Sequence, residues 1–252
     1  MMDASQTSAA APVAPVTIPL SVVAPVYKNA EFLDELASRV RSAVDCSYEL
    51  ILVNDASPDD ASAIISALAR RDSAIRGVEL PSNVGQQQAV LTGLRQSRGD
   101  WVIVLDADLQ DPPEAIPTLL AMGRAGYEAV FAGRRSKYQS LGRMLTSKLY
   151  KIAQCAICGV PLDAGMYLVL SRKGVESVLS LSGSDGLSLV GMIGLSGLRS
   201  TSVPIPRAKR ATGRSAYSNS HRFAVGVQYL ARAATWRWRN SPISSRYLGR
   251  TS

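Results

Sequence analysis

The chain has 252 residues, of which 46% are apolar and 19% charged; this suits one large α/β domain or two small ones and excludes a disordered chain. A single histidine excludes catalysis by paired imidazoles and a His-rich zinc site, and three cysteines are too few for a disulfide framework. The net charge of +8 is uneven, because eleven Lys and Arg but no acidic residue follow Asp185, so that residues 1–185 sum to −3. Such a basic end indicates a phosphorylated ligand, a polyanion or an anionic membrane surface as partner.

Strand and helix patterns alternate along the chain from Thr17 onward. Apolar runs and helical periodicity predict a strand at 18–23, a helix at 30–44, a strand at 48–53, a helix ending at Arg71, a strand at 75–80, a helix at 85–98, a strand at 101–105, and then a helix and a strand ending at Phe131. Later elements are a basic amphipathic helix at 141–158, a strand at 166–170, and helices near 173–181 and 223–236. This order predicts an α/β fold with a mostly parallel, doubly wound sheet that binds ligands at the carboxyl ends of its strands.

The domain organisation follows from the same patterns. Residues 1–16 lack the basic start and apolar run of a signal peptide and are expected to form a flexible tail. Residues 17–218 would form the α/β domain, and residues 219–252 a basic helical extension. The longest uncharged apolar stretch, 186–198, is shorter than the about 20 residues that span a bilayer, so a soluble chain is expected, attached at most to a membrane surface. Cys155 and Cys158 are expected to pack within a helix rather than to form a redox couple.

Asp106 and Asp108 carry the strongest chemical signal, because they directly follow the apolar run 101–105. Such a run is typical of a strand buried on both faces of a parallel sheet, which would put both carboxylates at its carboxyl end. Mg²⁺ and Mn²⁺ prefer oxygen ligands and share them with substrate phosphates, so a divalent cation is the natural partner. The alternative is a solvated or capping pair of acids, and Asp111 in particular is expected to cap a helix that begins at Pro112.

Six segments, in the same order along the chain, resemble family 2 glycosyltransferases of the GT-A fold. They are 21–27 (SVVAPVY), 53–60 (VNDASPDD), 83–89 (NVGQQQA), 106–114 (DADLQDPPE), 133–135 (GRR) and 210–217 (RATGRSAY). The resemblance is strongest to the branch of dolichyl-phosphate mannosyltransferases, bactoprenol glucosyltransferases and undecaprenyl-phosphate aminoarabinose transferases. It implies a metal-dependent enzyme that moves a sugar from a nucleotide sugar, with UDP favoured over GDP, to a polyprenyl phosphate with inversion.

The resemblance also implies roles for individual residues. Mg²⁺ or Mn²⁺ would be held by Asp106, Asp108 and Gln110. The donor would contact Pro25, Tyr27, Asn29, Asp55, Gly85, Gln86, Asp106, Ala107, Arg134, Arg135, Arg207 and Ser215. The catalytic residues would be Asp163, Asp108 and Arg210, with Asp163 as a base toward the acceptor. These roles agree with the chemistry, since a carboxylate accepts the N–H of a nucleobase and guanidinium groups match phosphate oxygens. Residues 207–217 are expected to close over the donor as a mobile basic loop.

Departures from the family pattern leave the acceptor open. Lys28-Asn29 replaces the family's Asn-Glu, Asn54 replaces an Asp, and residues 163–168 (DAGMYL) replace a D-x-G-D-F-R segment. The two carboxy-terminal membrane helices of bactoprenol-type relatives have no counterpart in this sequence. A soluble hydroxyl-bearing small molecule is therefore the alternative acceptor, and a non-catalytic nucleotide-sugar binding subunit is the alternative from another class.

The basic end of the chain raises one more alternative. Arg237 and Arg239 interleave with Trp236 and Trp238, a pattern that nucleic-acid binders use, but it equally suits an anionic membrane surface. The expected partners are the donor, the acceptor and an anionic membrane, without nucleic acid. The expected location is the cytoplasm, with peripheral attachment to the inner face of a membrane through 141–158 and the Arg/Trp-rich end.

Overall fold

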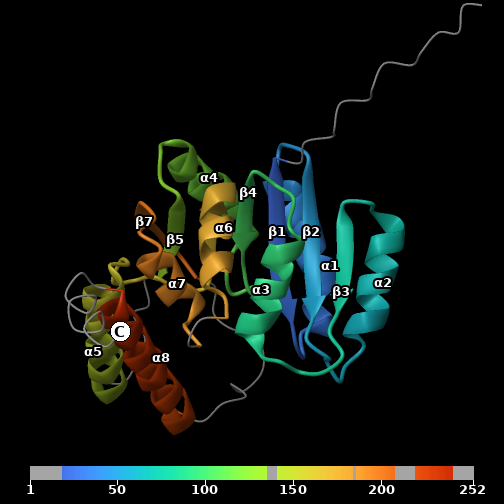
Figure 1. The fold of residues 1–252 in the computed structure, drawn as a ribbon. Helices are drawn as coiled ribbons and strands as arrows, with labels where there is room; N and C mark the ends of the chain where they lie inside the picture. Colours follow the sequence, from blue (N-terminus) through green and yellow to red (C-terminus); the bar gives the residue numbers. More distant parts are fainter. Residues whose placement is uncertain (1–18, 135–140, 184–185, 208–218, 241–252) are drawn as a thin grey trace, which may run out of the picture.

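The structure, a computed structural model, describes residues 19–134, 141–183, 186–207 and 219–240 (Figure 1). Its strands are β1 (Leu20–Val26), β2 (Tyr48–Asn54), β3 (Ile75–Glu79), β4 (Trp101–Val104), β5 (Ala129–Arg134), β6 (Leu168–Ser171) and β7 (Ser200–Ile205). Its helices are α1 (Leu33–Ala43), α2 (Ala61–Arg71), α3 (Gln86–Gln96), α4 (Ile116–Arg124), α5 (Leu141–Cys158), α6 (Arg172–Leu181), α7 (Leu189–Leu195) and α8 (Asn219–Arg239), with short 3-10 turns at Ala30–Phe32 and Pro113–Ala115. The predicted elements are all present with shifted bounds, and α7 and β7 are additional.

The strands form one seven-stranded sheet in the order β3-β2-β1-β4-β6-β5-β7. Neighbouring strands run parallel except at β6, which is antiparallel to both β4 and β5. Because two reversals cancel, β5 and β7 point the same way as β1 to β4. The carboxyl ends of these six strands therefore lie along one edge of the sheet, called the carboxyl edge below. The expected mostly parallel α/β sheet is confirmed.

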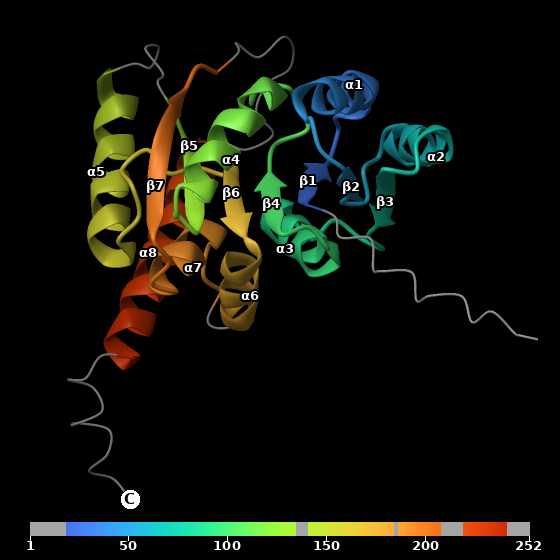
Figure 2. The same ribbon diagram turned by 90° about the horizontal axis from the view of Figure 1, so that it is seen from above.

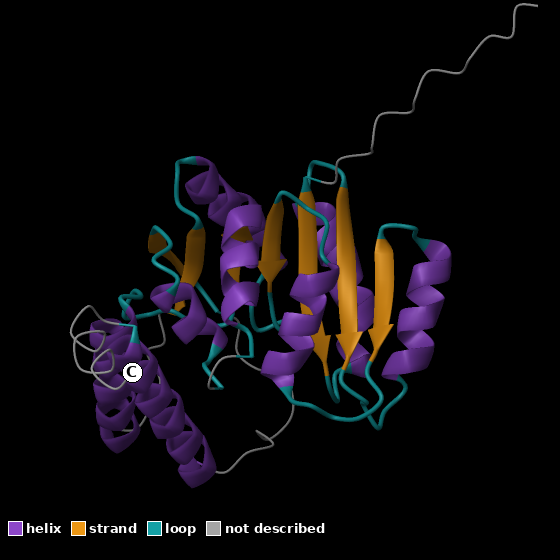
Figure 3. Cartoon of the chain, in the orientation of Figure 1, coloured by secondary structure: helices purple, strands orange, loops and turns teal. Residues whose placement is uncertain are grey.

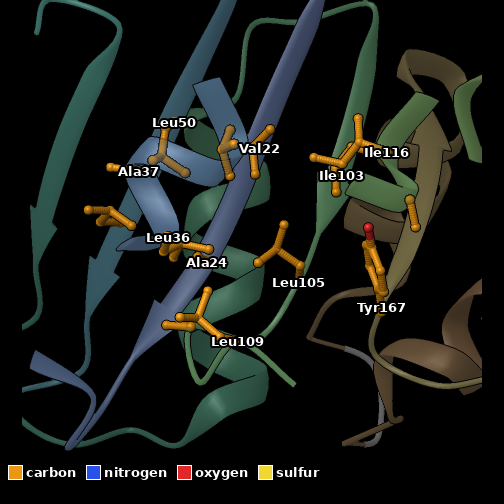
Figure 4. Packing of buried hydrophobic residues seen from close by; sticks show 14 of the residues in the cluster. Val22, Ala24, Leu36, Ala37, Leu50, Ile103, Leu105, Leu109, Ile116 and Tyr167 are labelled. Atoms are coloured by element: carbon orange, nitrogen blue, oxygen red, sulfur yellow. The ribbon is translucent and has the colours of Figure 1, made fainter. Parts of the chain in front are cut away.

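Two apolar cores cover the two faces of the sheet. Helices α1, α2 and α4 pack on one face, while α3, α6 and α7 pack on the other, as the view in Figure 2 separates them. Consecutive strand residues serve opposite cores: Val22 lies in the first and Val23 in the second, and both are 0% exposed. This explains the continuous apolar runs of the central strands, since both of their faces are buried. Figure 4 shows the first core, where Leu36 and Ile116 lie against residues of β1 and β4.

Helices α5 and α8 pack against each other at the β7 end of the sheet (Figures 1 and 2). Helix α8 contributes Ala233, 2% exposed, to the second core, so it is docked on the α/β domain. Cys158 of α5 is 3% exposed, and burial raises the pKa of its thiol; this agrees with a packed helix residue. Across the ranges that the structure describes, no helix combines the length and the apolar character needed to cross a membrane. The predicted boundaries at 16/17 and 218/219 involve residues outside the described ranges and stay predictions.

Candidate functional site

The loops at the carboxyl edge bring together segments that lie far apart in the sequence. Figure 3 shows β1, β2 and β3 ending at one edge, where their loops gather. Residues 27–29 follow β1, residues 55–60 follow β2, and residues 105–112 follow β4. Gly133 lies at the end of β5, and Arg207 follows β7. Residues 83–89 follow β3. The strand directions thus bring together four of the six segments that the sequence singled out, the described part of a fifth (133–134), and Arg207; residues 135 and 210–217 lie outside the described ranges.

Backbone strain is concentrated in the same loops. Among the described residues, the non-glycine positions with positive φ are Lys28 (58°), Ala56 (49°) and Leu109 (57°). They fall one each in the loops after β1, β2 and β4. A left-handed conformation costs an L-residue about 1–2 kcal/mol, and such outliers cluster at ligand sites. The strain points to this edge independently of any sequence motif.

The loop 105–112, called the metal loop because the sequence predicts a cation there, alternates between inward and outward side chains. Ala107 is 1% and Leu109 is 8% exposed, both in the first core, whereas the Asp106 side chain is 20% exposed. Asp108 is likewise only partly buried. The amide nitrogen of Gln86, at the start of α3, donates to Asp106 Oδ1 at 2.5 Å. Buried alternate residues thus hold the loop while both carboxylates face the edge; Ala107 itself offers only backbone atoms to a ligand.

Gln110 has a different immediate role from the one predicted. Its backbone N–H and its side-chain amide both donate to the Asp108 carboxylate, at 3.2 and 2.9 Å. Gln110 therefore orients Asp108. Whether its amide oxygen also contacts a metal stays a prediction.

Asp111 is paired with Arg207 and is not a helix cap. The 3-10 turn after it has Pro112 at its N-cap without a side-chain cap hydrogen bond, so the capping prediction is wrong. The Asp111 side chain is 4% exposed and accepts from Arg207 Nε at 2.7 Å and from a terminal nitrogen at 3.1 Å. The same terminal nitrogen lies 3.5 Å from Asp106 Oδ2. A buried carboxylate without a charge partner destabilises the fold more than a missing helix cap does. This explains why Asp111 pairs with Arg207.

Asp55 holds the loop before α3. Its side chain is buried, and its two oxygens accept the backbone N–H groups of Val84 and Gly85 at 2.7 and 2.9 Å. Asn83 donates to the Asp55 carbonyl at 3.2 Å. Gly85 has φ 87°, and open space surrounds the position of a Cβ there. In this state, therefore, Asp55 binds backbone amides, and its predicted contact with a nucleobase stays a prediction.

The loop after β1 carries the predicted donor residues Pro25, Tyr27 and Asn29. Pro25 is buried within β1, whereas Tyr27 is 38% exposed, with the Lys28 ammonium 5.3 Å from its ring centre. Asp59 joins this loop to the next one, because its carboxylate accepts the N–H of Ala30 at 3.0 Å.

The ionisation of Asp59 reflects these contacts. Burial by itself raises the pKa of the carboxyl, but hydrogen bonds from the Ser57 hydroxyl and from the Ala30 and Ala61 N–H groups outweigh it and lower the pKa below its ordinary value. The carboxylate is thus held charged where it links the two loops.

Asp163 and Tyr167 reach the carboxyl edge from the segment before β6. The Asp163 carboxylate lies so close to Gly133 that a Cβ at that position would collide with it. Tyr167, 2% exposed, donates its hydroxyl to the Pro112 carbonyl at 2.9 Å, and burial raises its pKa far above the ordinary range. The absence of a side chain at Gly133 therefore makes room for Asp163, and Tyr167 ties the metal loop to β6.

Several of the predicted site residues lie outside the part of the chain that the structure describes. Arg135, Arg210 and Ser215 lie outside the described residues, as does most of the expected loop at 207–217. Arg134 ends β5, and its side chain is not described.

The residues that are described fit a divalent cation. Asp106 and Asp108 supply hard carboxylate oxygens from one loop at the carboxyl edge. Among the described residues, no group of three or more His, Cys, Asp or Glu side chains is arranged around a common metal position. Mg²⁺ and Mn²⁺ suit this set, since such ions are bound by one or two carboxylates together with water and substrate phosphates.

Gln87 is a residue that sequence reasoning missed. Its amide donates to the Leu187 carbonyl at 2.6 Å and accepts the Leu189 N–H at 3.2 Å, which ties the start of α3 to the start of α7. The run of three glutamines at 86–88 was the available signal, but the pattern did not distinguish the one that faces Asp106 from the one that faces α7.

Comparisons with known proteins identify the family of the chain. The model of the family described as glycosyl transferase family 2 matches residues 21–173. An undecaprenyl-phosphate 4-deoxy-4-formamido-L-arabinose transferase of Pseudomonas fluorescens is 37% identical over 205 residues, which cover 79% of this chain and 60% of the relative. The corresponding Shewanella sediminis protein is 36% identical over 204 residues, with 79% and 61% covered. The chain thus spans about three fifths of the length of these relatives.

Solved structures share the fold. Glucosyl-3-phosphoglycerate synthase from Mycobacterium tuberculosis, in complex with Mn²⁺, UDP and glucosyl-3-phosphoglycerate, has a TM-score of 0.59 at 22% identity, over 86% of this chain and 79% of that one. A mannosyltransferase from Pyrobaculum calidifontis, in complex with GDP-Man and Mn²⁺, has a TM-score of 0.62 at 18% identity, over 93% and 68%. At these identities the likeness bears on the fold alone, and it confirms the expected GT-A fold.

Proposed function

The chain belongs to glycosyl transferase family 2, and we propose that it transfers a glycosyl group from a nucleotide sugar to a polyprenyl phosphate, with inversion at the anomeric carbon. The observation that carries the proposal is the pair Asp106 and Asp108 on a strained loop at the carboxyl edge, with Arg207 beside them. The relatives that are 37% identical are named for transfer to undecaprenyl phosphate, which supports this acceptor class.

The donor in this proposal is a UDP-sugar, with a GDP-sugar as the alternative. The base would lie in the space between the loops after β1 and β2, where Tyr27 offers an exposed ring. Asp55 would act there in two ways: by holding Val84 and Gly85 in place, and by accepting a base N–H with its remaining lone pairs. Asn29, Gln86 and the arginines Arg134 and Arg135 complete the proposed donor contacts.

Charge stabilisation of the leaving group is the chemical step that these residues would assist. A metal held by Asp106 and Asp108, with Gln110 beside them, would supply Lewis-acid charge to the diphosphate. Arg207 contributes a fixed positive charge, because its bond with the buried Asp111 holds the guanidinium next to Asp106. Arg210 and Ser215 are proposed to contact the donor from the segment that follows Arg207.

The acceptor determines what Asp163 must do. A phosphate is already anionic near neutral pH and attacks without a base, whereas a hydroxyl needs a group to take its proton. With a hydroxyl acceptor, Asp163→Asn should lower transfer by about 10²–10⁴-fold with donor binding unchanged. With a phosphate acceptor the loss should be much smaller. Parallel assays with undecaprenyl phosphate and with 3-phosphoglycerate as a hydroxyl-bearing acceptor decide between the two.

The cellular location is part of the proposal. A polyprenyl-phosphate acceptor lies in a membrane, and nucleotide sugars are supplied from the cytoplasm, so the protein would work at the inner face as a peripheral protein. The charge of +11 after Asp185 supports attachment to anionic lipid.

A thermal-shift series tests the donor site directly. UDP, GDP and other nucleoside diphosphates are compared with and without Mn²⁺, because a ligand that binds only the folded state raises the melting temperature by mass action. The proposal expects the largest rise with UDP together with Mn²⁺. Donor binding without transfer to any acceptor would favour the non-catalytic subunit, and no nucleotide-dependent shift would contradict the donor site.

A further inference from the structure

The first turn of α3 connects the metal loop with the start of α7 through two neighbouring glutamines. The side-chain amide of Gln86 donates to Asp106 Oδ1. The side-chain amide of Gln87 donates to the Leu187 carbonyl at 2.6 Å and accepts the Leu189 N–H at 3.2 Å. Consecutive residues of an α-helix are about 100° apart around its axis. A rotation of this turn would therefore move both amides together, so that the direction of one depends on the position of the other.

The direction of Gln86 depends on contacts made by its neighbours. Gln86 is exposed, and holding its long side chain in one conformation costs rotamer entropy. The N-cap of α3 is Gly85, which provides no side-chain cap for the first turn. The turn is held from outside instead. On one side, Asp55 accepts the N–H groups of Val84 and Gly85, and on the other side Gln87 binds the start of α7.

The start of α7 is a rigid anchor for Gln87. Leu187 and Leu189 are both 0% exposed and belong to the second core. Ser188, between them, caps α7 by accepting the Gly191 N–H at 3.1 Å. Gln87 uses both the donor and the acceptor of its amide at this anchor, which fixes the orientation of the amide. Because the anchor is packed in the core, it sets the position of the α3 turn.

We propose that Gln87 is a positioning residue for the metal loop: its two hydrogen bonds to the start of α7 fix the first turn of α3, and this turn aims Gln86 at Asp106. The inference rests on the proposed function, because it concerns the cation that Asp106 and Asp108 would hold. Residues that orient the ligands of a metal typically contribute about 10–100-fold to its affinity. In this assignment Gln87 acts through Gln86 and contacts neither the cation nor the donor.

Calorimetry of Mn²⁺ binding with UDP present tests the proposal. Methionine variants are used, because methionine is about as long as glutamine but is only a weak hydrogen-bond acceptor. Gln86→Met should weaken Mn²⁺ binding by about 10–100-fold and Gln87→Met by about 10-fold. The double variant should bind Mn²⁺ as Gln86→Met does, because Gln87 then has no side chain left to position. Gln88→Met, at the exposed third glutamine of the run, is the matched control and should bind Mn²⁺ as the wild type does.

A second control separates positioning from a loss of stability. Gln87→Met leaves the Leu187 carbonyl and the Leu189 N–H without their partner, so its melting temperature should fall, but Gln87 is only partly buried and the variant should stay folded. Ser171→Ala removes the N-cap hydrogen bond of α6 at the opposite edge of the sheet, so it should also lower the melting temperature, with the Mn²⁺ affinity unchanged.

The outcomes distinguish this inference from the proposed function. Wild-type Mn²⁺ affinity in Gln87→Met, or a loss in Gln87→Met that adds in full to the loss in Gln86→Met, would overturn the inference alone. An equal loss of affinity in Ser171→Ala would do the same, because lost stability would then explain the result. A wild type that binds no Mn²⁺ in the presence of UDP would overturn the proposed metal site and the inference with it.

Discussion

At the scale of single residues, the two acids of the metal loop are each held by hydrogen bonds from neighbouring side chains. Asp108 accepts two hydrogen bonds from Gln110, and Asp106 accepts hydrogen bonds from Gln86 and Arg207. Such fixed carboxylates bind a cation without first losing side-chain freedom, which is the basis of a preorganised site. Their positions at the carboxyl edge support the proposed metal site.

Replacing Asp108 by Asn should abolish the Mn²⁺-dependent part of the UDP thermal shift and lower turnover by about 10²–10³-fold, the range for loss of one charge-stabilising group. The melting temperature without metal should change little, because Asp108 is partly exposed in a loop. Asp45→Asn, at an exposed position in the loop between α1 and β2, is the matched control and should behave as the wild type. Full activity of Asp108→Asn, or activity undiminished by EDTA, would contradict the assignment.

Arg207 and Asp111 should depend on each other for stability. Arg207→Ala leaves a buried carboxylate without its partner, at a cost of about 3 kcal/mol in the free energy of unfolding; this is the lower end of the range because the Arg207 side chain is 23% exposed. Adding Asp111→Asn should recover part of that loss, and urea denaturation of the four proteins measures the coupling. If the two losses simply add, the pair is not coupled as the distances indicate.

At the scale of elements, β6 and the segment before it brace the metal loop. The hydroxyl of the buried Tyr167 donates to the carbonyl of the partly buried Pro112, and this hydrogen bond joins residues 55 positions apart. The Arg39 side chain of α1 adds a second brace, donating two hydrogen bonds of 2.8 Å to Glu114. The loop is thus held from two sides while its acids face the edge.

The variant Tyr167→Phe keeps the buried ring but leaves the Pro112 carbonyl without its donor. It should lower the free energy of unfolding by about 1–2 kcal/mol and weaken Mn²⁺ binding, measured by calorimetry with UDP present. Tyr127→Phe, which keeps the ring that the Arg199 guanidinium faces at 4.7 Å, is the control. Unchanged stability in Tyr167→Phe would show that the hydrogen bond does not brace the loop.

At the scale of the whole molecule, carboxylates that tie elements together predict how stability depends on pH. Hydrogen bonds from Arg39 lower the pKa of Glu114, and those from Lys173 lower the pKa of Glu128; the net shift of Asp59 is also downward. A pKa that is lower in the folded state than in the unfolded state stabilises the fold above the ordinary value and loses that effect as the pH falls through the folded value.

The free energy of unfolding should therefore be flat from neutral pH to about pH 5 and decline below about pH 4, the ordinary range of these groups. Urea denaturation at a series of pH values measures it. Glu114→Gln should make the decline shallower, and an identical slope would remove Glu114 from the explanation. Because this side chain is more than half exposed, its share is a small part of the total.

The sequence could predict most elements and the position of the metal loop, because an apolar run such as 101–105 is typical of a strand buried on both faces. It could not predict the antiparallel direction of β6, since an apolar run reads the same in both directions. The sequence could not predict the pairing of Arg207 with Asp111 for a related reason. It depends on β7 lying beside β5 and ending at the same edge, which no local pattern specifies, and local helix-start signals instead favoured the wrong cap.

The position of β6 between β4 and β5 also has a consequence for how the chain folds during synthesis. β5 is made before β6, yet its sheet partners are only β6 and β7. At about 5–20 residues per second, the ribosome needs about 2–7 s to extend from Arg134 to Leu168, and throughout that time β4 has an open edge and β5 has no partner. Nascent chains arrested with β5 outside the ribosome but β6 still inside it should be cleaved by protease near 129–134, whereas chains arrested with β7 fully outside should resist. During translation there is thus an interval in which two apolar strands can pair with incorrect strands.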